Sequence, residues 1–238
     1  MKRAYLILIS ALIFVGSSAT QGQKPIQLFA ERSANPEALK LNRQAYDQMI
    51  RGDLTNAART IELAMQKDPT LWVTYFSRAR LFQVEGKFEL AIQDCNWVLR
   101  KHPDFIEAVL LRAYANAHLR RYNESLKELD NLIRMPLQLD SYARTLQARA
   151  CILATSRDKS VRNGAQAVKD AKLACKLTNW DDGAAIEILA LAYAETGDFD
   201  SAMLYAEQAR TTKGATPLTL RSVERDLAFF KQHKPVRL

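Results

Sequence analysis

Histidine and cysteine are the side chains of this sequence best suited to metal binding, acid–base chemistry or nucleophilic catalysis. The three histidines, His102, His118 and His233, stand far apart, and no two of them have the spacing of four residues that places two imidazoles on one helix face. The three cysteines are also widely separated and lack the short spacing of a zinc site. We therefore expect no metal site, no cofactor and no catalytic residue of this kind.

Carboxylates are the other candidates for chemistry, because a pair of them can act as acid and base. Examples are Asp94, Asp130, Asp181 and Asp182. A charge on a helix surface, or a helix N-cap, is the simpler interpretation of each. The chain also has no Gly-rich phosphate loop and no Gly-x-Ser-x-Gly nucleophile elbow. We predict that the protein is not an enzyme and has no small-molecule substrate.

The chain is basic overall, with 34 Lys and Arg against 26 Asp and Glu and a formal net charge of +8. A domain that binds nucleic acid concentrates such charge on one face or in one stretch. Here the basic residues gather only at Arg120-Arg121 and in a sparse basic end, residues 231–238, and elsewhere they alternate with acidic residues. The sequence therefore predicts a mixed-charge surface and no nucleic-acid partner.

The first residues have the pattern of an export signal. Lys2 and Arg3 form a positive start, an apolar run follows from Ala4 to Val15, and small residues lead to Ala19. This run is too short to span a bilayer comfortably. We interpret residues 1–19 as a signal peptide and expect an exported protein, in the bacterial periplasm or secreted. The alternative is an uncleaved N-terminal membrane anchor.

A period of 34 residues organises the next part of the chain. Gly52 and Gly86 are 34 residues apart, and so are Pro69 and Pro103. Small residues recur at the same step in two further series, and a large apolar or aromatic residue recurs in a third. These series are Ala45, Ala79 and Ala113; Ala57, Ala91 and Ser125; and Leu54, Phe88 and Tyr122.

Helix packing explains these recurring residues, which we call the repeat marks. Where two antiparallel helices cross closely, there is room for little more than a methyl group. Gly52 and Gly86 suit a turn with a positive φ between the helices, and each proline prevents a second helix from continuing. The period resembles the tetratricopeptide repeat (TPR). This resemblance implies an all-α fold, a TPR α-solenoid of about five helix-turn-helix repeats with a C-terminal capping helix.

The repeat marks are irregular in the fourth unit and regular again in the fifth. The fifth unit carries Ala190, Tyr193, Gly197, Phe199, Ala202 and Ala209, and the fourth carries Leu153-Ala154-Thr155, Arg162-Asn163-Gly164 and Trp180. This pair of units, with the ending at 227–237, is similar to a variant pair in bacterial TPR proteins. The helices of the fourth unit are expected at 139–154 and 163–177, with a long connection between them.

The expected organisation of the chain follows from these units. A segment at 20–37, partly disordered, precedes the repeats. The TPR domain then covers 38–215, as repeats at 38–71, 72–105 and 106–139, an irregular unit at 140–181 and a last repeat at 182–215. A capping helix and a basic tail occupy 216–238. Cys95 falls at a core position of the second repeat. Cys151 and Cys175 fall on two helices of one hairpin, and the sequence leaves open whether they pair.

The TPR resemblance also implies where a ligand would lie, because the first helices of such repeats line a concave groove. The residues that it places in the groove are Asn42, Tyr46, Phe76, Arg80, Glu107, Tyr114 and His118. Tyr and Arg are enriched at binding hot spots, and apolar positions with few polar anchors suit a peptide. Packing against neighbouring repeats is the other interpretation of each residue. The TPR clamp for a C-terminal carboxylate needs Lys and Asn where this chain has Asn42 and Tyr46, so we expect no such clamp.

Two functions fit this sequence. The first is a protein–protein interaction module or adaptor that binds a protein or peptide partner in the groove. The alternative is a structural or self-associating scaffold subunit of an envelope complex. Exposure of Tyr46, Phe76 and Tyr114 would favour the adaptor, whereas an exposed apolar last helix around Phe229 and Phe230 would favour the scaffold.

Overall fold

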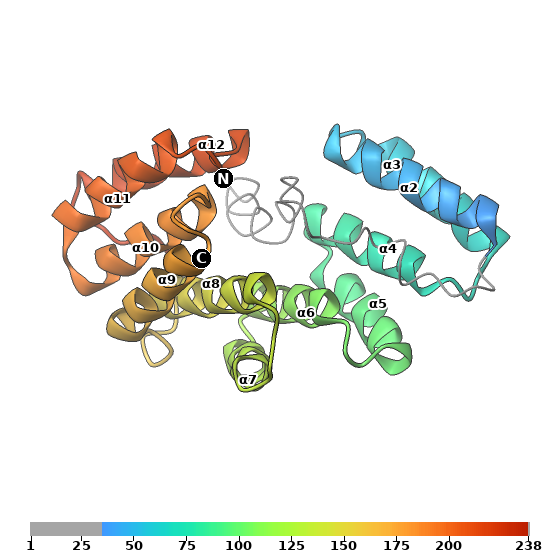
Figure 1. The fold of residues 1–238 in the computed structure, drawn as a ribbon, viewed down its shortest axis with the longest axis horizontal. Helices are drawn as coiled ribbons and strands as arrows, with labels where there is room; N and C mark the ends of the chain where they lie inside the picture. Colours follow the sequence, from blue (N-terminus) through green and yellow to red (C-terminus); the bar gives the residue numbers. More distant parts are fainter. Residues whose placement is uncertain (1–34, 238) are drawn as a thin grey trace. The chain divides into compact units, whose positions relative to one another are not determined.

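The structure is a computed structural model that describes residues 35–237. The predicted signal peptide and residues 20–34 lie outside the described residues. In the described part the chain forms α-helices and no strands, so the predicted all-α fold is confirmed (Figure 1). The helices are α2 (Pro36–Ile50), α3 (Leu54–Lys67), α4 (Trp72–Val84), α5 (Phe88–Lys101), α6 (Ile106–His118), α7 (Tyr122–Ile133), α8 (Leu139–Thr155), α9 (Gly164–Leu177), α10 (Gly183–Thr196), α11 (Phe199–Thr211) and α12 (Pro217–Phe230). None of these described helices is both long and apolar enough to cross a lipid bilayer.

The described residues form two compact units, one ending at Ala115 and the other beginning at Asn116. The boundary lies within α6. The first unit therefore contains α2 to α5 and most of α6, and the second contains the end of α6 and α7 to α12.

The first unit is built from two helix hairpins, α2 with α3 and α4 with α5. The small residues predicted at the helix crossings, Ala45, Ala57, Ala79 and Ala91, have no exposed surface. A larger side chain at such a position would strain the packing of the two helices. The small residues of the repeat therefore lie at the close helix contact that holds each hairpin together.

The turns between paired helices depend on one residue with a left-handed backbone. Gly52 and Gly86 have φ of 80° and 75°, and Gly197 between α10 and α11 has 85°. Arg120 holds the equivalent place after α6 with a φ of 60°. A left-handed conformation costs an L-residue about 1–2 kcal/mol, so the degenerate third repeat keeps its turn at the expense of stability.

Replacing Arg120 by Gly is expected to raise the free energy of unfolding by about 1 kcal/mol, because glycine reaches positive φ without a Cβ clash. Urea denaturation measures the change. Gly52→Ala is the matched control: a Cβ there would meet no atom within 4 Å, so its expected loss of about 1 kcal/mol would come from the backbone alone. A stability unchanged or lowered by Arg120→Gly would contradict the assignment of strain to this turn.

The second unit contains the α8–α9 and α10–α11 hairpins, and α12 packs on α10 and α11. Helices α8 and α9 lie within a residue of the predicted ranges. The long connection between them is held by its own hydrogen bonds, including Asn163 N–H to the Leu153 carbonyl at 2.9 Å. Helix α12 buries Val223 and Phe230 completely. Because Phe230 lies in this core, it does not supply the exposed apolar surface that would favour a scaffold.

The three cysteines are free thiols in the interior. Cys95 is fully buried on α5, as expected of a small hydrophobic residue. The pairing left open for Cys151 and Cys175 is not formed. Burial raises the pKa of each of these two thiols to about 12, so both are protonated and weakly nucleophilic at neutral pH.

Candidate partner-binding surface

The seven predicted groove residues lie on three first helices of the repeats, α2, α4 and α6. Six belong to the first unit, and His118 belongs to the second. Phe76, Arg80 and Tyr114 are buried, whereas Asn42, Tyr46, Glu107 and His118 are only partly covered. The prediction therefore selected residues in two different environments.

Tyr46 and Arg80 are brought together across neighbouring first helices. The Arg80 guanidinium carbon lies 5.0 Å from the centre of the Tyr46 ring, a cation–π contact between α2 and α4. Arg80 is 6% exposed, so its charge is held against the ring rather than free in water. This contact holds a guanidinium and an aromatic ring together between α2 and α4.

Two amide side chains on the same helices carry polar atoms without a hydrogen-bond partner. The Asn42 Oδ1 atom on α2 is a buried acceptor, and the Gln83 Nε2 atom on α4 is a buried donor. An unmet buried hydrogen bond typically costs about 1–3 kcal/mol, and a peptide backbone offers both complements. By the repeat register both residues fall at groove positions. We call the face carrying Asn42, Tyr46, Arg80 and Gln83 the first-helix face.

Phe76 and Tyr114 do not present the exposed rings that would favour a free groove. Phe76 is 2% exposed and meets Phe105 edge-to-face at 4.8 Å between ring centres. Tyr114 is 4% exposed and meets Phe88 at 6.0 Å. Phe76 finds its aromatic partner at the end of its own repeat and Tyr114 finds one in the preceding repeat, so both rings are buried by packing. Phe76 and Tyr114 are therefore packing residues. That either of them contacts a ligand stays a prediction.

The two remaining predicted residues lie on α6. Glu107 is half-buried in its first turn. His118 is in the last turn, where burial lowers the pKa of its imidazole to about 4. His118 is therefore neutral at physiological pH and carries no positive charge there.

The carboxylates raised as acid–base candidates have structural contacts. Asp94 accepts two hydrogen bonds from Arg78, at 2.7 and 2.8 Å. Asp130 accepts one from Arg149 at 2.7 Å, and Asp182 caps α10 as predicted, at 2.9 Å from the Ala184 nitrogen. Among the residues that the structure describes, no three His, Cys, Asp or Glu side chains converge as metal ligands would.

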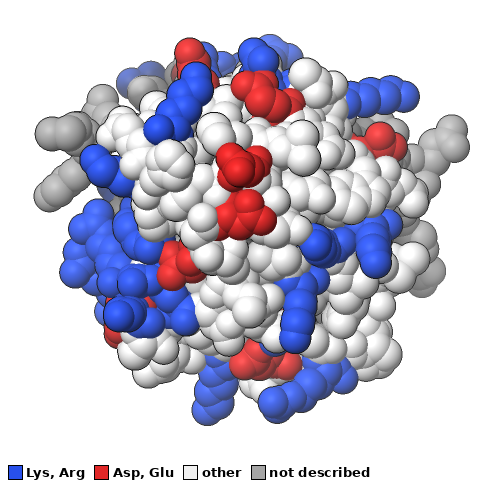
Figure 2. Space-filling model, turned by 90° about the vertical axis from the view of Figure 1, so that its left-hand side faces the viewer, with Lys and Arg blue, Asp and Glu red and all other residues white. Residues whose placement is uncertain are grey.

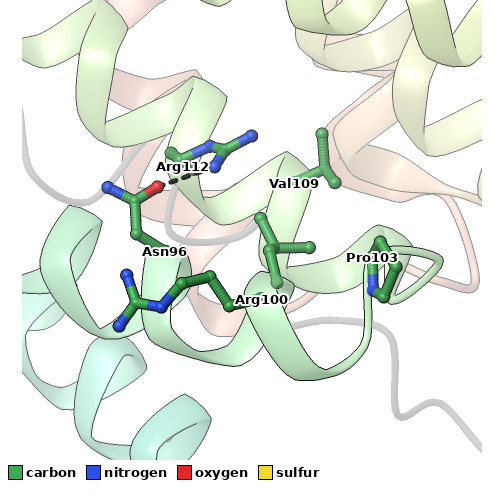
Figure 3. Close-up of a pocket in the computed structure, with 6 residues that line it drawn as sticks. Asn96, Arg100, Pro103, Val109 and Arg112 are labelled. Carbon is green, nitrogen blue, oxygen red and sulfur yellow. Dashed lines mark hydrogen bonds between the residues drawn. The ribbon is translucent and has the colours of Figure 1, made fainter.

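A shallow pocket of about 450 Å³ lies between α5 and α6 in the first unit (Figure 3). Its lining residues are Asn96, Leu99, Arg100, Pro103, Val109 and Arg112. Arg112 donates a hydrogen bond to Asn96 Oδ1 at 2.7 Å, so part of its charge is already engaged. None of the predicted groove residues lines this pocket. Sequence reasoning did not find it, because it arises from the packing of two helices of neighbouring repeats and has no motif.

The charge distribution on one face of the molecule is mixed (Figure 2). On this face, which lies at the α11 side of Figure 1, basic side chains are interspersed with acidic ones and with a broad uncharged area. The face agrees with the mixed-charge surface expected from the sequence.

Sequence comparison finds a relative that matches part of this chain. No family model matches the chain. A tetratricopeptide repeat and J domain-containing co-chaperone of Cryptococcus neoformans var. grubii is 27% identical over 143 residues, which are 60% of this chain and 24% of that protein. The chain thus spans about a quarter of the length of this curated relative.

Comparison with solved structures addresses the fold. A thermophilic TPR protein of Thermus thermophilus matches with a TM-score of 0.64 and 16% identity over 82% of this chain and 99% of its own. PilF of Pseudomonas aeruginosa matches with a TM-score of 0.60 and 15% identity, over 82% of this chain and 89% of its own. A TPR protein of Parabacteroides merdae gives 0.55 and 18%, over 84% and 75%. The chain therefore has the fold of tetratricopeptide-repeat proteins.

Proposed function

We propose that this protein is an exported adaptor or assembly factor that binds a protein or peptide partner on the first-helix face. The TPR fold is typical of modules for protein–protein interaction. The observation that carries the proposal is the Tyr46–Arg80 contact beside two amide side chains with unmet hydrogen bonds. Export rests on the signal pattern of residues 1–19.

The chemistry of this face favours an extended or helical peptide over a small molecule. An aromatic ring and a guanidinium give directional contacts with acidic or carbonyl groups of a partner. The Asn42 and Gln83 amides supply one acceptor and one donor, which is the complement of a peptide group. Both atoms are buried, so a bound backbone would pair with them only if the Asn42 and Gln83 side chains turn toward it.

The test is a pull-down from the native envelope fraction with the wild type and two variants, Asn42→Ala and the double variant Tyr46→Ala/Arg80→Ala. Arg59→Ala is the matched control, because Arg59 is an exposed arginine on α3, a second helix of the first unit. All proteins must show the same helical circular dichroism and urea midpoint. We expect the control to retain the partner and both variants to retain at least about tenfold less, as loss of hot-spot contacts would cause.

Two outcomes would count against the proposal. A partner retained equally by all four proteins would place the contact elsewhere, for example on the second helices. Capture of the protein's own copies alone, in every variant, would favour the alternative of a self-associating scaffold. Phe76→Ala and Tyr114→Ala are unsuitable for this test because truncating a buried ring leaves a cavity that lowers stability whatever the ring binds. Arg80 is also buried, so the double variant is informative only if its urea midpoint equals that of the wild type.

A further inference from the structure

Residues 231–237, which we call the return segment, turn back from the end of α12 onto the second unit. His233 has a φ of 52°, and its N–H bonds to the Phe230 carbonyl at 2.8 Å. Lys234 N–H bonds to the Phe229 carbonyl at 3.1 Å. These bonds reverse the chain, so the residues after Pro235 reach the ends of α8 and α10.

Side chains near both ends of the return segment contact the second unit. The His233 ring meets Phe199 on α11 edge-to-face, with 5.2 Å between ring centres. The side chains from Lys231 to Lys234 are exposed. Val236, by contrast, is 2% exposed, and the Arg237 guanidinium lies 2.6 Å from Glu195 Oε2. Beyond the His233 contact, the segment is therefore held by a buried apolar residue followed directly by an arginine.

The receptor for this arginine is made by the C-terminal ends of two helices. Arg237 Nη1 donates to the Ala154 carbonyl, 3.2 Å away, in the last turn of α8. Glu195 lies in the last turn of α10. Carbonyls in a last helical turn have no partner within the helix and carry the negative end of its dipole. Both helix ends thus favour a cation at this point, and the Glu195 carboxylate adds a full negative charge.

Glu195 binds two guanidinium groups with separate oxygens. Its Oε1 atom accepts a hydrogen bond from Arg162 Nε at 2.9 Å, and its Oε2 atom faces Arg237. Arg162 also donates to the Ser156 carbonyl at 3.1 Å, which ties it to the connection after α8. The Arg162 contact is part of the unit's own framework. Oε2 and the Ala154 carbonyl, in contrast, are contacted by Arg237 of the return segment.

We infer that this receptor, formed by Glu195, the Ala154 carbonyl and the surroundings that bury Val236, is a recognition site for a hydrophobic residue followed by arginine in an extended segment. The chain's own return segment fills it in cis, and a partner segment with the same pair displaces the return segment. The site lies in the second unit and uses none of the first-helix face, so it goes beyond the function proposed above.

The probe for this site is a fluorescein-labelled peptide, acetylated and amidated, with the sequence of residues 232–238, Gln-His-Lys-Pro-Val-Arg-Leu. It is titrated against the full chain and against a released variant, Val236→Asp/Arg237→Ala. A tethered segment competes at an effective concentration in the millimolar range. We therefore expect fluorescence anisotropy to show at least about tenfold tighter peptide binding to the released variant than to wild type. Lys234→Ala is the matched control, since Lys234 is exposed, and it should behave like wild type.

Specificity is tested on both sides of the contact. A peptide with Ala in place of its Arg should bind the released variant at least about tenfold more weakly, as should the original peptide when Glu195→Gln is added to that variant. Glutamine keeps an oxygen for Arg162 but removes the charge that attracts the guanidinium. If Val236→Asp disturbs the circular dichroism spectrum, Arg237→Ala alone is used and should give a smaller gain of the same sign.

The inference is overturned if the folded released variant binds the peptide no better than wild type does, or if the Arg-to-Ala peptide binds equally well. Exchange of the return segment between two copies would also overturn docking in cis. Light scattering would then show a dimer of the wild type and a monomer of the released variant. The assay needs no native partner. Its failure is therefore distinct from a failure of the pull-down that tests the first-helix face.

Discussion

Asp226→Asn is expected to gain stability relative to wild type by roughly 2–4 kcal/mol as the pH rises from 4 to 7. Asp226 on α12 is 1% exposed, and burial raises the pKa of its carboxyl to about 7, although the charge of Arg225 and its hydrogen bond oppose the shift. The folded protein therefore holds a proton that the unfolded chain releases near pH 4. The stabilisation from this proton is complete below pH 4 and is lost as the pH approaches 7. Asparagine has no proton to lose.

A second buried carboxyl makes this site sensitive to pH. Glu187 on α10 is 3% exposed, and burial, with the nearby charge of Asp226, raises the pKa of its side chain well above the usual range. The other groups that act on the pair are Arg225 and Ser222 on α12, Asp182 at the start of α10 and Cys151 on α8. Two carboxylates so placed repel each other when both are ionised. Glu187→Gln should therefore shift the pH profile in the same direction as Asp226→Asn.

Urea denaturation at each pH unit from 4 to 8 measures this effect as the difference in free energy of unfolding between variant and wild type. The control is Arg221→Gln, which removes an exposed charge from the same helix. Its difference from wild type should stay nearly constant, because arginine does not titrate in this range. A constant difference for Asp226→Asn as well would show that Asp226 is ionised throughout, and the prediction would be wrong.

Arg149→Ala is expected to lower the free energy of unfolding by about 3–4 kcal/mol, the range for breaking a buried ion pair by removing one partner. Arg149 on α8 donates two hydrogen bonds to Asp170 on α9, each of 2.8 Å, and one of 2.7 Å to Asp130 on α7. The Asp170 side chain is only 5% exposed. Without Arg149 its charge would stay buried with Gln166 as its remaining hydrogen-bond donor, at 2.8 Å.

Two comparisons separate this effect from general loss of an arginine. Arg210→Ala breaks an exposed pair with Glu207, whose side chains are 53% and 48% exposed, and should cost under about 1 kcal/mol. The double variant Arg149→Met/Asp170→Leu removes both buried charges and should recover most of the loss. Thermal and urea denaturation measure all three. A loss for Arg149→Ala no larger than that for Arg210→Ala would show that the pair contributes little.

The repeat pattern predicted the helices and turns of this protein because each mark has a local cause. A glycine such as Gly52 is needed wherever a short turn requires positive φ, and an alanine such as Ala45 wherever two paired helices cross. These causes act within about 34 residues. They therefore survive in a single sequence, even at Arg120, where the residue type changed but the backbone conformation did not.

The candidate site was predicted less well, since groove positions follow from the repeat register but exposure does not. The register places Tyr46 and Phe76 on the first helices, and it cannot tell that Phe76 meets Phe105 while Tyr46 stays half-buried beside Arg80. Whether a ring faces solvent depends on which residues from other helices pack against it, as Phe105 does against Phe76. The position of a ring within its own helix does not carry that information.

By itself, then, the sequence determined the helix periodicity, the turns and the class of fold, because short-range sterics and hydrophobic spacing decide them. Only the tertiary structure decided which groups that are far apart in the sequence come into close contact. Arg237 reaches a carbonyl 83 residues away, and Gly214 must lack a side chain because a Cβ would lie 1.9 Å from the Asp181 carbonyl oxygen. Such contacts arise where separate helices happen to end beside each other, and no local pattern marks them. These long-range contacts set the charge, burial and accessibility of any binding site on this chain.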